Sequence, residues 1–205
     1  MSGRGRLIAF EGVEGAGKST HLRAAAAALR QRGIEVIETR EPGGTPLGAE
    51  LRRLVMYGTA PAPMTELLLY LADRAQHVAA VVAPAMARGA VVLTDRFSAS
   101  TLAYQSYARG LDLSLVSHLD EVARQGVAAD LVLLLDCGVD VGLGRARGSD
   151  RFHREDRAFH ERVRQGFLAL AAQDPLRYRV LDATAPMHDL QREILVLINA
   201  CVERP

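Results

Sequence analysis

The chain has 205 residues, of which 49% are hydrophobic and 24% charged, a composition typical of a globular domain and not of a disordered, collagen-like or low-complexity chain. Its 25 lysines and arginines against 24 acidic residues leave a formal charge of +1, which creates no overall field for holding nucleic acid or an anionic membrane. The apolar runs are far shorter than the roughly 20 residues of a membrane span, so we expect a cytoplasmic protein without membrane or nucleic-acid partners.

Apolar runs alternate with amphipathic segments along the chain, which predicts an α/β fold with a mostly parallel sheet. Strands are predicted at Leu7–Glu11, Glu35–Thr39, Ala90–Thr94, Asp130–Leu135 and Arg179–Asp182. Helices are predicted at Lys18–Arg32, Pro46–Met56, Met64–Arg88, Leu113–Arg124, Val141–Arg147, Asp156–Gln173 and Pro186–Val202. The third and fourth strands are continuously hydrophobic, which places them in the middle of a sheet covered on both faces. No linker or repeat divides the chain, so we expect one domain over residues 1–205.

The residues after the first strand match the phosphate-binding pattern G-x-x-x-x-G-K-[ST]. They are Gly12, Val13, Glu14, Gly15, Ala16, Gly17, Lys18 and Ser19. The glycines let backbone N–H groups turn toward phosphate oxygens, and the following helix presents its positive end to the same anion. Lys18, the only lysine in the chain, is predicted to reach the β and γ phosphates, and Ser19 to bind Mg²⁺. The alternative is a glycine turn before a helix that binds no ligand.

The single lysine also narrows the class of nucleotide-binding protein. A guanine-reading N-K-x-D motif needs a second lysine, which the chain lacks. The chain is also short for a motor ATPase with an accessory domain. Transfer of a phosphoryl group to a small molecule is therefore the favoured class.

Two further clusters follow strand ends. Asp95 and Arg96 come after the third strand, where a carboxylate can hold Mg²⁺ and an arginine can bind phosphate in a bidentate manner. A surface ion pair is the alternative for these two residues. Arg40 comes directly after the second strand and begins a turn rich in proline and glycine, so its side chain can point at a second anion.

An arginine-rich segment follows the fourth strand. It contains Arg145, Arg147, Arg151, Arg154, Arg157, Arg162 and Arg164. The residues Gly148 to Asp150 interrupt the helical pattern, which predicts a loop that covers phosphates, the lid, over about residues 145–156. A solvated face with helical ion pairs is the alternative, which we favour for Arg157, Arg162 and Arg164, whereas Arg147 and Arg151 are assigned to function.

Together these motifs resemble the thymidylate kinase family over essentially the whole chain. The segments that carry the resemblance are, in order, GVEGAGKS, REPGGT, LLYLADRAQHV, DRFSASTLAYQ and LVLLLD. The resemblance implies a P-loop kinase fold with a central five-stranded parallel sheet, flanked by helices on both faces and closed by an arginine-rich lid. It also implies a homodimer that transfers the γ-phosphoryl group of ATP to dTMP with Mg²⁺, in dTTP biosynthesis.

The resemblance assigns a role to individual residues. It implies that ATP is bound by the residues from Gly12 to Ser19 together with Thr20 and Arg145. It implies that the metal is bound by Ser19 and Asp95. For dTMP it implies Glu14 near the 3′-hydroxyl, Arg40 and Arg96 at the phosphate, Tyr70 stacked on thymine, Arg74 and Thr101 at the base, Tyr104 beneath the ribose and Gln105 in the same pocket. Tyr104 would exclude a 2′-hydroxyl. Positive charge for catalysis is expected from Lys18, Arg96, Mg²⁺ and a lid arginine, Arg147 or Arg151.

The sequence departs from the common family pattern at a few positions. Gly15 stands where some members carry an arginine, so the chain resembles those members that supply arginines from the lid. Tyr70 replaces a more frequent phenylalanine, and Phe97 a more frequent tyrosine.

Three other functions stay open from the sequence: a kinase for another nucleoside or nucleotide, a nucleotide-binding switch without catalysis, and a nucleic-acid binder that uses the arginine segment. The apolar stripe on the helix from Met64 is explained equally well by a homodimer interface and by burial within one subunit. Cys137 and Cys201 lack metal-ligand spacing and are predicted to be buried thiols.

Overall fold

The computed structural model describes residues 4–146 and 151–203, in which a five-stranded parallel sheet has the strand order β2-β3-β1-β4-β5. The strands are β1 (Leu7–Glu11), β2 (Val36–Arg40), β3 (Val91–Asp95), β4 (Leu131–Asp136) and β5 (Tyr178–Asp182). The predicted α/β class is confirmed, and each strand overlaps its predicted range. The two continuously hydrophobic strands, β3 and β4, flank β1 inside the sheet, as predicted.

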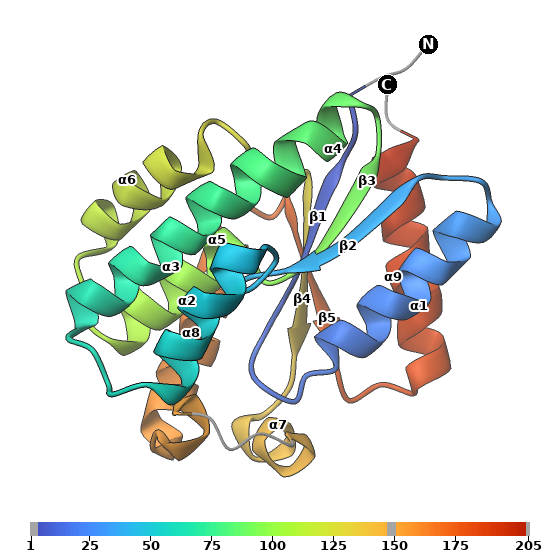
Figure 1. Cartoon of the computed structure of the whole chain (residues 1–205). Coiled ribbons are helices and arrows are strands. Elements are labelled where there is room, and N and C mark those ends of the chain that lie inside the picture. The colour runs from blue at the N-terminus through green and yellow to red at the C-terminus, as the bar shows by residue number, and fades with distance from the viewer. Residues whose placement is uncertain (1–3, 147–150, 204–205) are drawn as a thin grey trace.

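Helices cover both faces of this sheet (Figure 1). On one face lie α1 (Lys18–Gln31) and α9 (Met187–Val202). On the other side lie α2 (Pro46–Tyr57), α3 (Pro63–His77), α4 (Ala83–Ala87), α5 (Ser98–Thr101), α6 (Leu113–Arg124) and α8 (Arg157–Gln173). The short helix α7 (Val139–Arg145) lies beyond the carboxyl end of β4. Side chains alternate along β1, so Ile8 and Phe10 pack among residues of α1 and α9, while Leu7 and Ala9 pack on the opposite face.

The long helix predicted from Met64 is not regular throughout. A π-helical turn, Val78–Val82, separates α3 from α4, and Ala83 donates its N–H to the carbonyl of Val78. Pro84 explains the interruption, because proline has no N–H and its ring clashes with the carbonyl four residues earlier in a regular helix. The wider turn lets the chain continue in the same direction.

One helix was missed by the sequence analysis. Residues 98–108 form a continuous helix, α5 followed by a π-helical segment, Leu102–Ala108. The segment carries no clear helical spacing of apolar residues. Its first turn is instead capped by a distant carboxylate, that of Glu11 at the end of β1, which no local pattern shows.

The predicted lid is described only in part. Helix α7 begins earlier than predicted and ends at Arg145, and a 3-10 turn, Phe152–Arg154, follows. Arg147 and the predicted helix break at Gly148 to Asp150 lie outside the described residues. Of the helical ion pairs expected farther along, Arg164 lies 3.9 Å from Glu161. The closer partners are on other elements, since Arg157 Nε lies 3.0 Å from Asp140 in α7 and Arg164 Nε lies 2.8 Å from Asp136 in β4.

Cys137 and Cys201 are buried thiols, as predicted, and they form no disulfide with each other. Among the helices in residues 4–146 and 151–203, none has both the length and the apolar character that a membrane crossing requires.

Candidate active site

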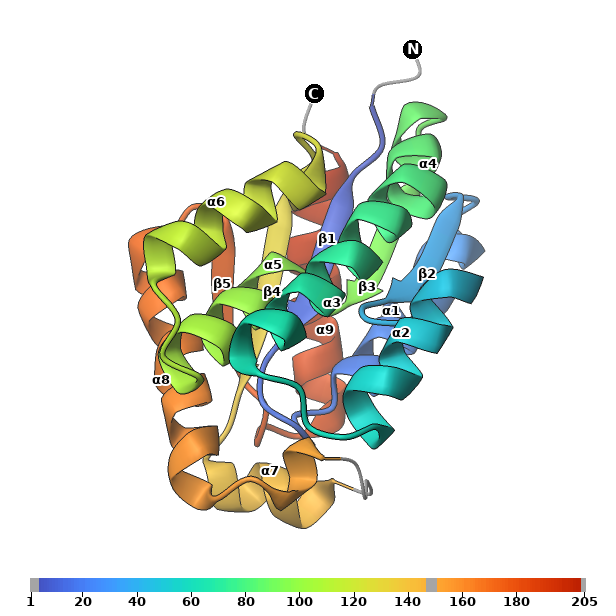
Figure 2. The ribbon, with the colours of Figure 1, turned by 60° about the vertical axis from the view of Figure 1, so that its left-hand side comes forward.

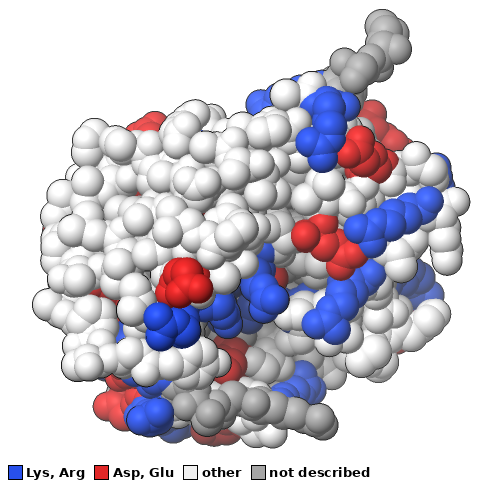
Figure 3. All heavy atoms as spheres, viewed as in Figure 1, with Lys and Arg blue, Asp and Glu red and all other residues white. Residues whose placement is uncertain are grey.

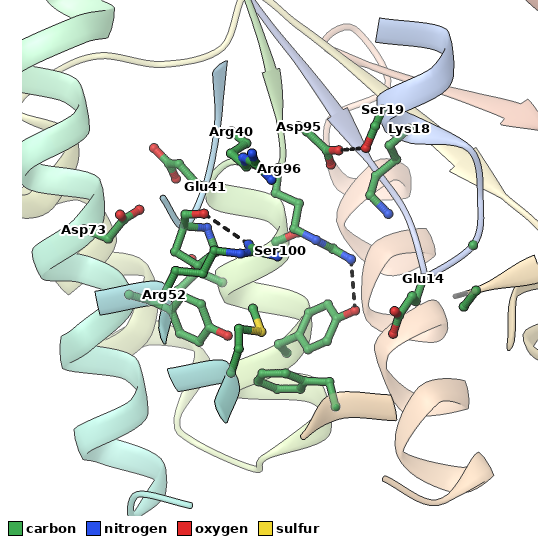
Figure 4. Close-up of a pocket in the computed structure, with 18 of the residues that line it drawn as sticks. Glu14, Lys18, Ser19, Arg40, Glu41, Arg52, Asp73, Asp95, Arg96 and Ser100 are labelled. Carbon is green, nitrogen blue, oxygen red and sulfur yellow. Dashed lines mark hydrogen bonds between the residues drawn. The ribbon is translucent and has the colours of Figure 1, made fainter. Parts of the chain in front are cut away.

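The strand order gathers the predicted motifs at one edge of the sheet. Because β2, β3 and β1 are neighbours and parallel, the segments that follow them lie side by side at their carboxyl ends. A cavity of about 640 Å³ opens there (Figure 4). Lysine and arginine side chains gather around it across the middle of the face shown in Figure 3. Its volume is in the range of small-molecule sites.

Most of the predicted site residues line this cavity. They are Glu14, Gly15, Gly17, Lys18, Ser19, Thr20, Arg40, Tyr70, Arg74, Asp95, Arg96, Thr101, Tyr104, Gln105 and Arg145. Gly12, Val13 and Ala16 belong to the same loop but do not line the cavity, and neither does Arg151.

The backbone of the phosphate-binding loop requires glycine. Gly15 has φ +73°, and a Cβ on it would lie 1.9 Å from the carbonyl oxygen of Gly142 in α7. A side chain there is excluded both by the left-handed conformation and by the close approach of α7. The loop leads directly into α1 at Lys18, so the positive end of that helix faces the cavity.

Lys18 lies in the loop with its ammonium group turned inward. Its Nζ donates hydrogen bonds to the carbonyl oxygens of Gly12, at 3.1 Å, and Val13, at 2.7 Å. Burial, together with the positive charge of Arg96, lowers the pKa of Lys18 to about 8, although nearby carboxylates oppose the shift. Among residues 4–146 and 151–203, no carboxylate is hydrogen-bonded to this ammonium group, which lies at the cavity.

Next to Lys18, the hydroxyl of Ser19 donates a hydrogen bond to the carboxylate of Asp95 (Figure 4). These two groups bring together oxygen ligands from α1 and β3. Oxygen ligands of this kind suit Mg²⁺, which binds few protein groups and keeps water or substrate phosphate as its other ligands.

Arg96 crosses from the end of β3 toward the loop. Its Nη1 donates to the carbonyl oxygen of Gly12 at 3.2 Å and to Ser100 Oγ at 2.9 Å, and its Nη2 donates to the hydroxyl of Tyr104 at 3.3 Å. Its guanidinium carbon lies 5.2 Å from the centre of the Tyr104 ring. Arg40, at the end of β2, also lines the cavity, and its side chain makes no hydrogen bond or ion pair with any residue that the structure describes.

The far end of the cavity is lined by aromatic and buried polar side chains. Burial raises the pKa of Tyr70, so its ring is a neutral surface. Arg74 is 3% exposed, and its Nε and Nη2 donate to Glu41 Oε2 at 2.8 and 2.6 Å. Its Nη1 donates to Thr101 Oγ1 at 2.8 Å and to the carboxylate of Asp120. Two buried carboxylates thus fix the arginine that the sequence analysis placed at the base.

Gln105 presents an acceptor atom at this end. Its Nε2 donates to Glu66 Oε1 at 2.9 Å, which turns the amide oxygen the other way. Among the described residues, that buried oxygen has no hydrogen-bond partner. A ligand with an N–H group can supply the missing donor.

The lid arginines differ in their surroundings. Arg145 lines the cavity and donates to the carbonyl oxygen of Ala183 at 2.8 Å. Arg151 is turned to the buried carboxylate of Glu66 and donates to the carbonyl oxygen of Val55 at 3.1 Å.

Several residues at the site escaped the sequence analysis. Arg52 and Asp73 line the cavity from α2 and α3, and Glu41 and Ser100 line it from segments already noted as motifs. Glu11, the last residue of β1, was also not assigned, although a charged residue at the end of an apolar strand is a sequence signal for a ligand-binding site. Asp73 lies in the segment LLYLADRAQHV, which was noted as a motif, although no role was given to this residue. Arg52 lies on an amphipathic helix, where the sequence gives no signal that separates it from surface residues.

Comparison with known proteins gives a consistent result. A family model described as thymidylate kinase matches residues 10–194. Thymidylate kinase of Trichlorobacter lovleyi is 50% identical over 189 residues, covering 87% of this chain and 89% of that protein. Thymidylate kinase of Pseudomonas entomophila is 49% identical over 205 residues, covering 98% of both chains. The crystal structure of thymidylate kinase from Ehrlichia chaffeensis is similar with a TM-score of 0.79 and 29% identity, covering 96% of this chain and 99% of that one.

Proposed function

The chain belongs to the thymidylate kinase family, and on that premise we propose that the cavity at the ends of β1, β2 and β3 binds dTMP next to the phosphates of ATP. The chain is a kinase that phosphorylates dTMP in dTTP synthesis, with ATP as the phosphoryl donor. The single observation that carries the assignment of the cavity is Arg96. It joins the carbonyl of Gly12 in the phosphate-binding loop to Tyr104 on the acceptor side.

On the donor side, we assign the ATP phosphates to the loop from Gly12 to Thr20. Ser19 and Asp95, whose oxygens are hydrogen-bonded to each other, are the residues that would hold Mg²⁺, which would neutralise charge on the donor phosphates. Arg145 is assigned to ATP because it lines the same cavity. For Arg151 to act on the transferred group, it must leave Glu66, and Arg147 lies outside the described residues.

On the acceptor side, we assign the phosphate of dTMP to Arg40 and Arg96. Glu14 is assigned to the 3′-hydroxyl; its carboxylate also lies 3.1 Å from His153 Nδ1. Tyr104, which Arg96 holds through its hydroxyl, is assigned to the face of the ribose, where a 2′-hydroxyl would clash.

The thymine base fits the far end of the cavity. Tyr70 offers a neutral ring for stacking. Thymine carries a donor at N3 and acceptors at O2 and O4, which complement the unpaired oxygen of Gln105 and the guanidinium of Arg74. Thr101 lies beside Arg74 and accepts one of its hydrogen bonds.

The chain's own residues supply charge and alignment for the reaction. Phosphoryl transfer spreads negative charge over the transferred oxygens, so fixed positive groups stabilise the transition state more than the ground state. Lys18, which is buried, and Arg96, which is half-buried, are cations next to the loop, and no covalent intermediate is needed. We also propose that the chain is a single kinase domain whose lid, about residues 145–156, excludes water from the transferred group.

An acceptor panel tests this function. We expect ADP production from ATP and Mg²⁺ to depend strongly on dTMP, to be weaker with dUMP, and to be poor with the thymine ribonucleotide because of Tyr104. The panel also contains dCMP, dGMP, dAMP and a reaction without acceptor. Preference for another acceptor would overturn the pocket assignment, and ADP release that does not depend on an acceptor would favour a nucleotide-binding switch.

We further propose that two copies of the chain form a homodimer through α3, α4 and α6. The helical segment from α3 to α4 exposes only uncharged residues. They are Pro63, Met64, Thr65, Leu68, Ala72, Gln76, Ala79, Ala80, Pro84 and Ala87. Figures 1 and 2 show α6 alongside α3, and Figure 3 shows a wide uncharged area over these helices. Leu115 and Val122 of α6 add exposed apolar surface.

The core of one subunit explains only part of the apolar stripe on this segment. Leu67, Leu71, Val78 and Val82 are buried within the chain, whereas Leu68 is 51% exposed. The uncharged exposed surface of the segment from α3 to α4 suits a second copy of the same segment, because this part of the interface would bury no unpaired charge.

A charge on this surface is expected to separate the subunits. In Leu68→Arg, two guanidinium groups would be buried without partners, so we expect a monomer where the unchanged protein is a dimer. The measurement is mass by light scattering after size-exclusion chromatography. Val196→Arg is the matched control, because Val196 is 62% exposed on α9 at the opposite face. A monomeric unchanged protein, or dissociation by Val196→Arg alone, would contradict the proposal.

A further inference from the structure

Glu11 is a buried carboxylate that none of the roles above uses. It is the last residue of β1, directly before the phosphate-binding loop, and is fully buried at 0% exposure. Its Oε1 accepts hydrogen bonds from the backbone N–H of Phe97, at 2.7 Å, and of Ser100, at 3.2 Å. Its Oε2 accepts from the hydroxyl of Ser100 at 2.5 Å. All of these partners lie within four residues after Arg96.

The backbone of Arg96 is held by hydrogen bonds on both sides, and Glu11 makes one of them with the next residue. Arg96 has φ +75°, a left-handed conformation that non-glycine residues adopt only when their surroundings impose it. Its N–H donates to Phe10 O at 2.9 Å, and its carbonyl accepts from Thr94 Oγ1 at 2.9 Å. The next N–H along the chain, that of Phe97, is the one that Glu11 binds. Glu11 therefore closes the turn that aims Arg96 into the cavity.

The side chain of Arg96 is linked to Glu11 through Ser100. Because the Ser100 hydroxyl donates its only hydrogen to Glu11, its oxygen is left as an acceptor, and Arg96 Nη1 donates to it at 2.9 Å. Figure 4 shows Arg96 and Ser100 side by side in the cavity. Without the carboxylate, the hydroxyl hydrogen loses this acceptor, so nothing in this pair of contacts fixes the direction in which the oxygen faces Arg96.

We propose that Glu11 is a positioning residue for Arg96, which it holds by its backbone through Phe97 and by its guanidinium through Ser100. The proposal rests on the assignment of Arg96 to the phosphate of dTMP. It gives Glu11 a role in phosphate recognition, although Glu11 itself is buried behind the cavity and does not line it.

The test compares two ligands that differ only in the phosphate. Dissociation constants for dTMP and thymidine are measured with the full chain, and the ratio of thymidine to dTMP reports what the phosphate contributes. We expect Glu11→Ala to lower this ratio by about tenfold or more, the effect of losing hydrogen bonds to a charged group, while thymidine binding changes by less than about twofold. Glu11→Gln keeps an acceptor for both N–H groups and is expected to recover most of the loss.

A double-mutant cycle identifies the residue through which Glu11 acts. In an Arg96→Ala background, Glu11→Ala is expected to cause no further fall in the ratio. Asp130→Asn is the matched control, because Asp130 accepts the N–H of Leu7 at the other end of β1 at 2.8 Å, and it should leave the ratio unchanged. If Glu11→Ala does not fold, Glu11→Gln and Ser100→Ala carry the test, and Ser100→Ala is expected to lower the ratio severalfold.

Different results would overturn different parts of the argument. An equal loss of thymidine and dTMP binding in Glu11→Ala would show that Glu11 only supports the helix at 98–108, and would reject the proposal. A fall that persists in the Arg96→Ala background would reject it as well. If Arg96→Ala itself leaves the ratio unchanged, the assignment of Arg96 to the phosphate fails, and the positioning role fails with it.

Discussion

Replacing Arg96 by alanine is expected to lower the turnover of dTMP by about a thousandfold or more, within the range known for arginines that stabilise a transferred phosphoryl group. Arg96 is a half-buried cation that contacts both the loop, through Gly12, and the acceptor side, through Tyr104. Its loss removes charge at the place where charge develops in the transition state. Turnover is measured as dTMP-dependent ADP production, with circular dichroism as the check on folding.

Two control variants make this result specific. Arg96→Lys keeps the charge but lacks the planar fork, so it cannot reach Gly12, Ser100 and Tyr104 together, and it should recover only a small part of the activity. Arg23→Ala removes an exposed arginine on α1 and should leave turnover unchanged. Near-normal turnover of a folded Arg96→Ala variant would reject the catalytic role.

The parts of the site that could be predicted from the sequence are those that lie directly at strand ends. The glycine-rich loop, Arg40 and the Asp95–Arg96 pair each follow an apolar run. Parallel strands direct all their carboxyl ends to one edge of the sheet. The α/β fold, which the alternating pattern predicts, is therefore enough to predict that these motifs lie at the same edge of the sheet. The structure adds that β2, β3 and β1 are neighbours, which brings the three motifs into one cavity.

The contacts that fix these residues could not be predicted in the same way. Glu11 and Ser100 are separated by 89 positions in the sequence, and Arg74 and Asp120 by 46. No local pattern relates such partners, because their approach depends on how whole helices pack. The helix at 98–108 was missed for the same reason, since its cap comes from β1.

Arg74 lies at the cavity, as predicted, but its hydrogen-bond partners were not predicted from the sequence. The family resemblance implied only that Arg74 lies at the base. In the structure it lines the cavity, but Glu41 and Asp120 hold its guanidinium on two sides. A donor fixed in this way is oriented before a ligand arrives, which favours selection among bases over strength of binding. The carboxylates also keep its charge compensated in a buried place.

Replacing Lys18 by methionine is expected to lower turnover by about a hundredfold to a thousandfold, as for the loss of one preorganised donor to a developing charge. Methionine keeps an unbranched side chain of similar length and removes the ammonium group. Because Lys18 donates to Gly12 O and Val13 O, the variant also loses two hydrogen bonds within the loop. ATP binding is measured beside turnover, and normal turnover with normal ATP affinity would reject the role.

The lowered pKa of Lys18 gives this prediction a second and independent readout. With a pKa of about 8, Lys18 is largely neutral in the free protein at about pH 9, and the phosphates of ATP would favour its charged form. At about pH 9, ATP binding should therefore take up a proton, which calorimetry detects as a binding enthalpy that depends on the buffer's ionisation enthalpy.

The same pKa shift affects the stability of the free protein. In the unfolded chain Lys18 keeps its proton above pH 8, so the free energy of unfolding should rise as the pH increases from about 8 to the ordinary lysine pKa of 10.5. Both effects should be absent in Lys18→Met, and their persistence there would assign the proton to another group.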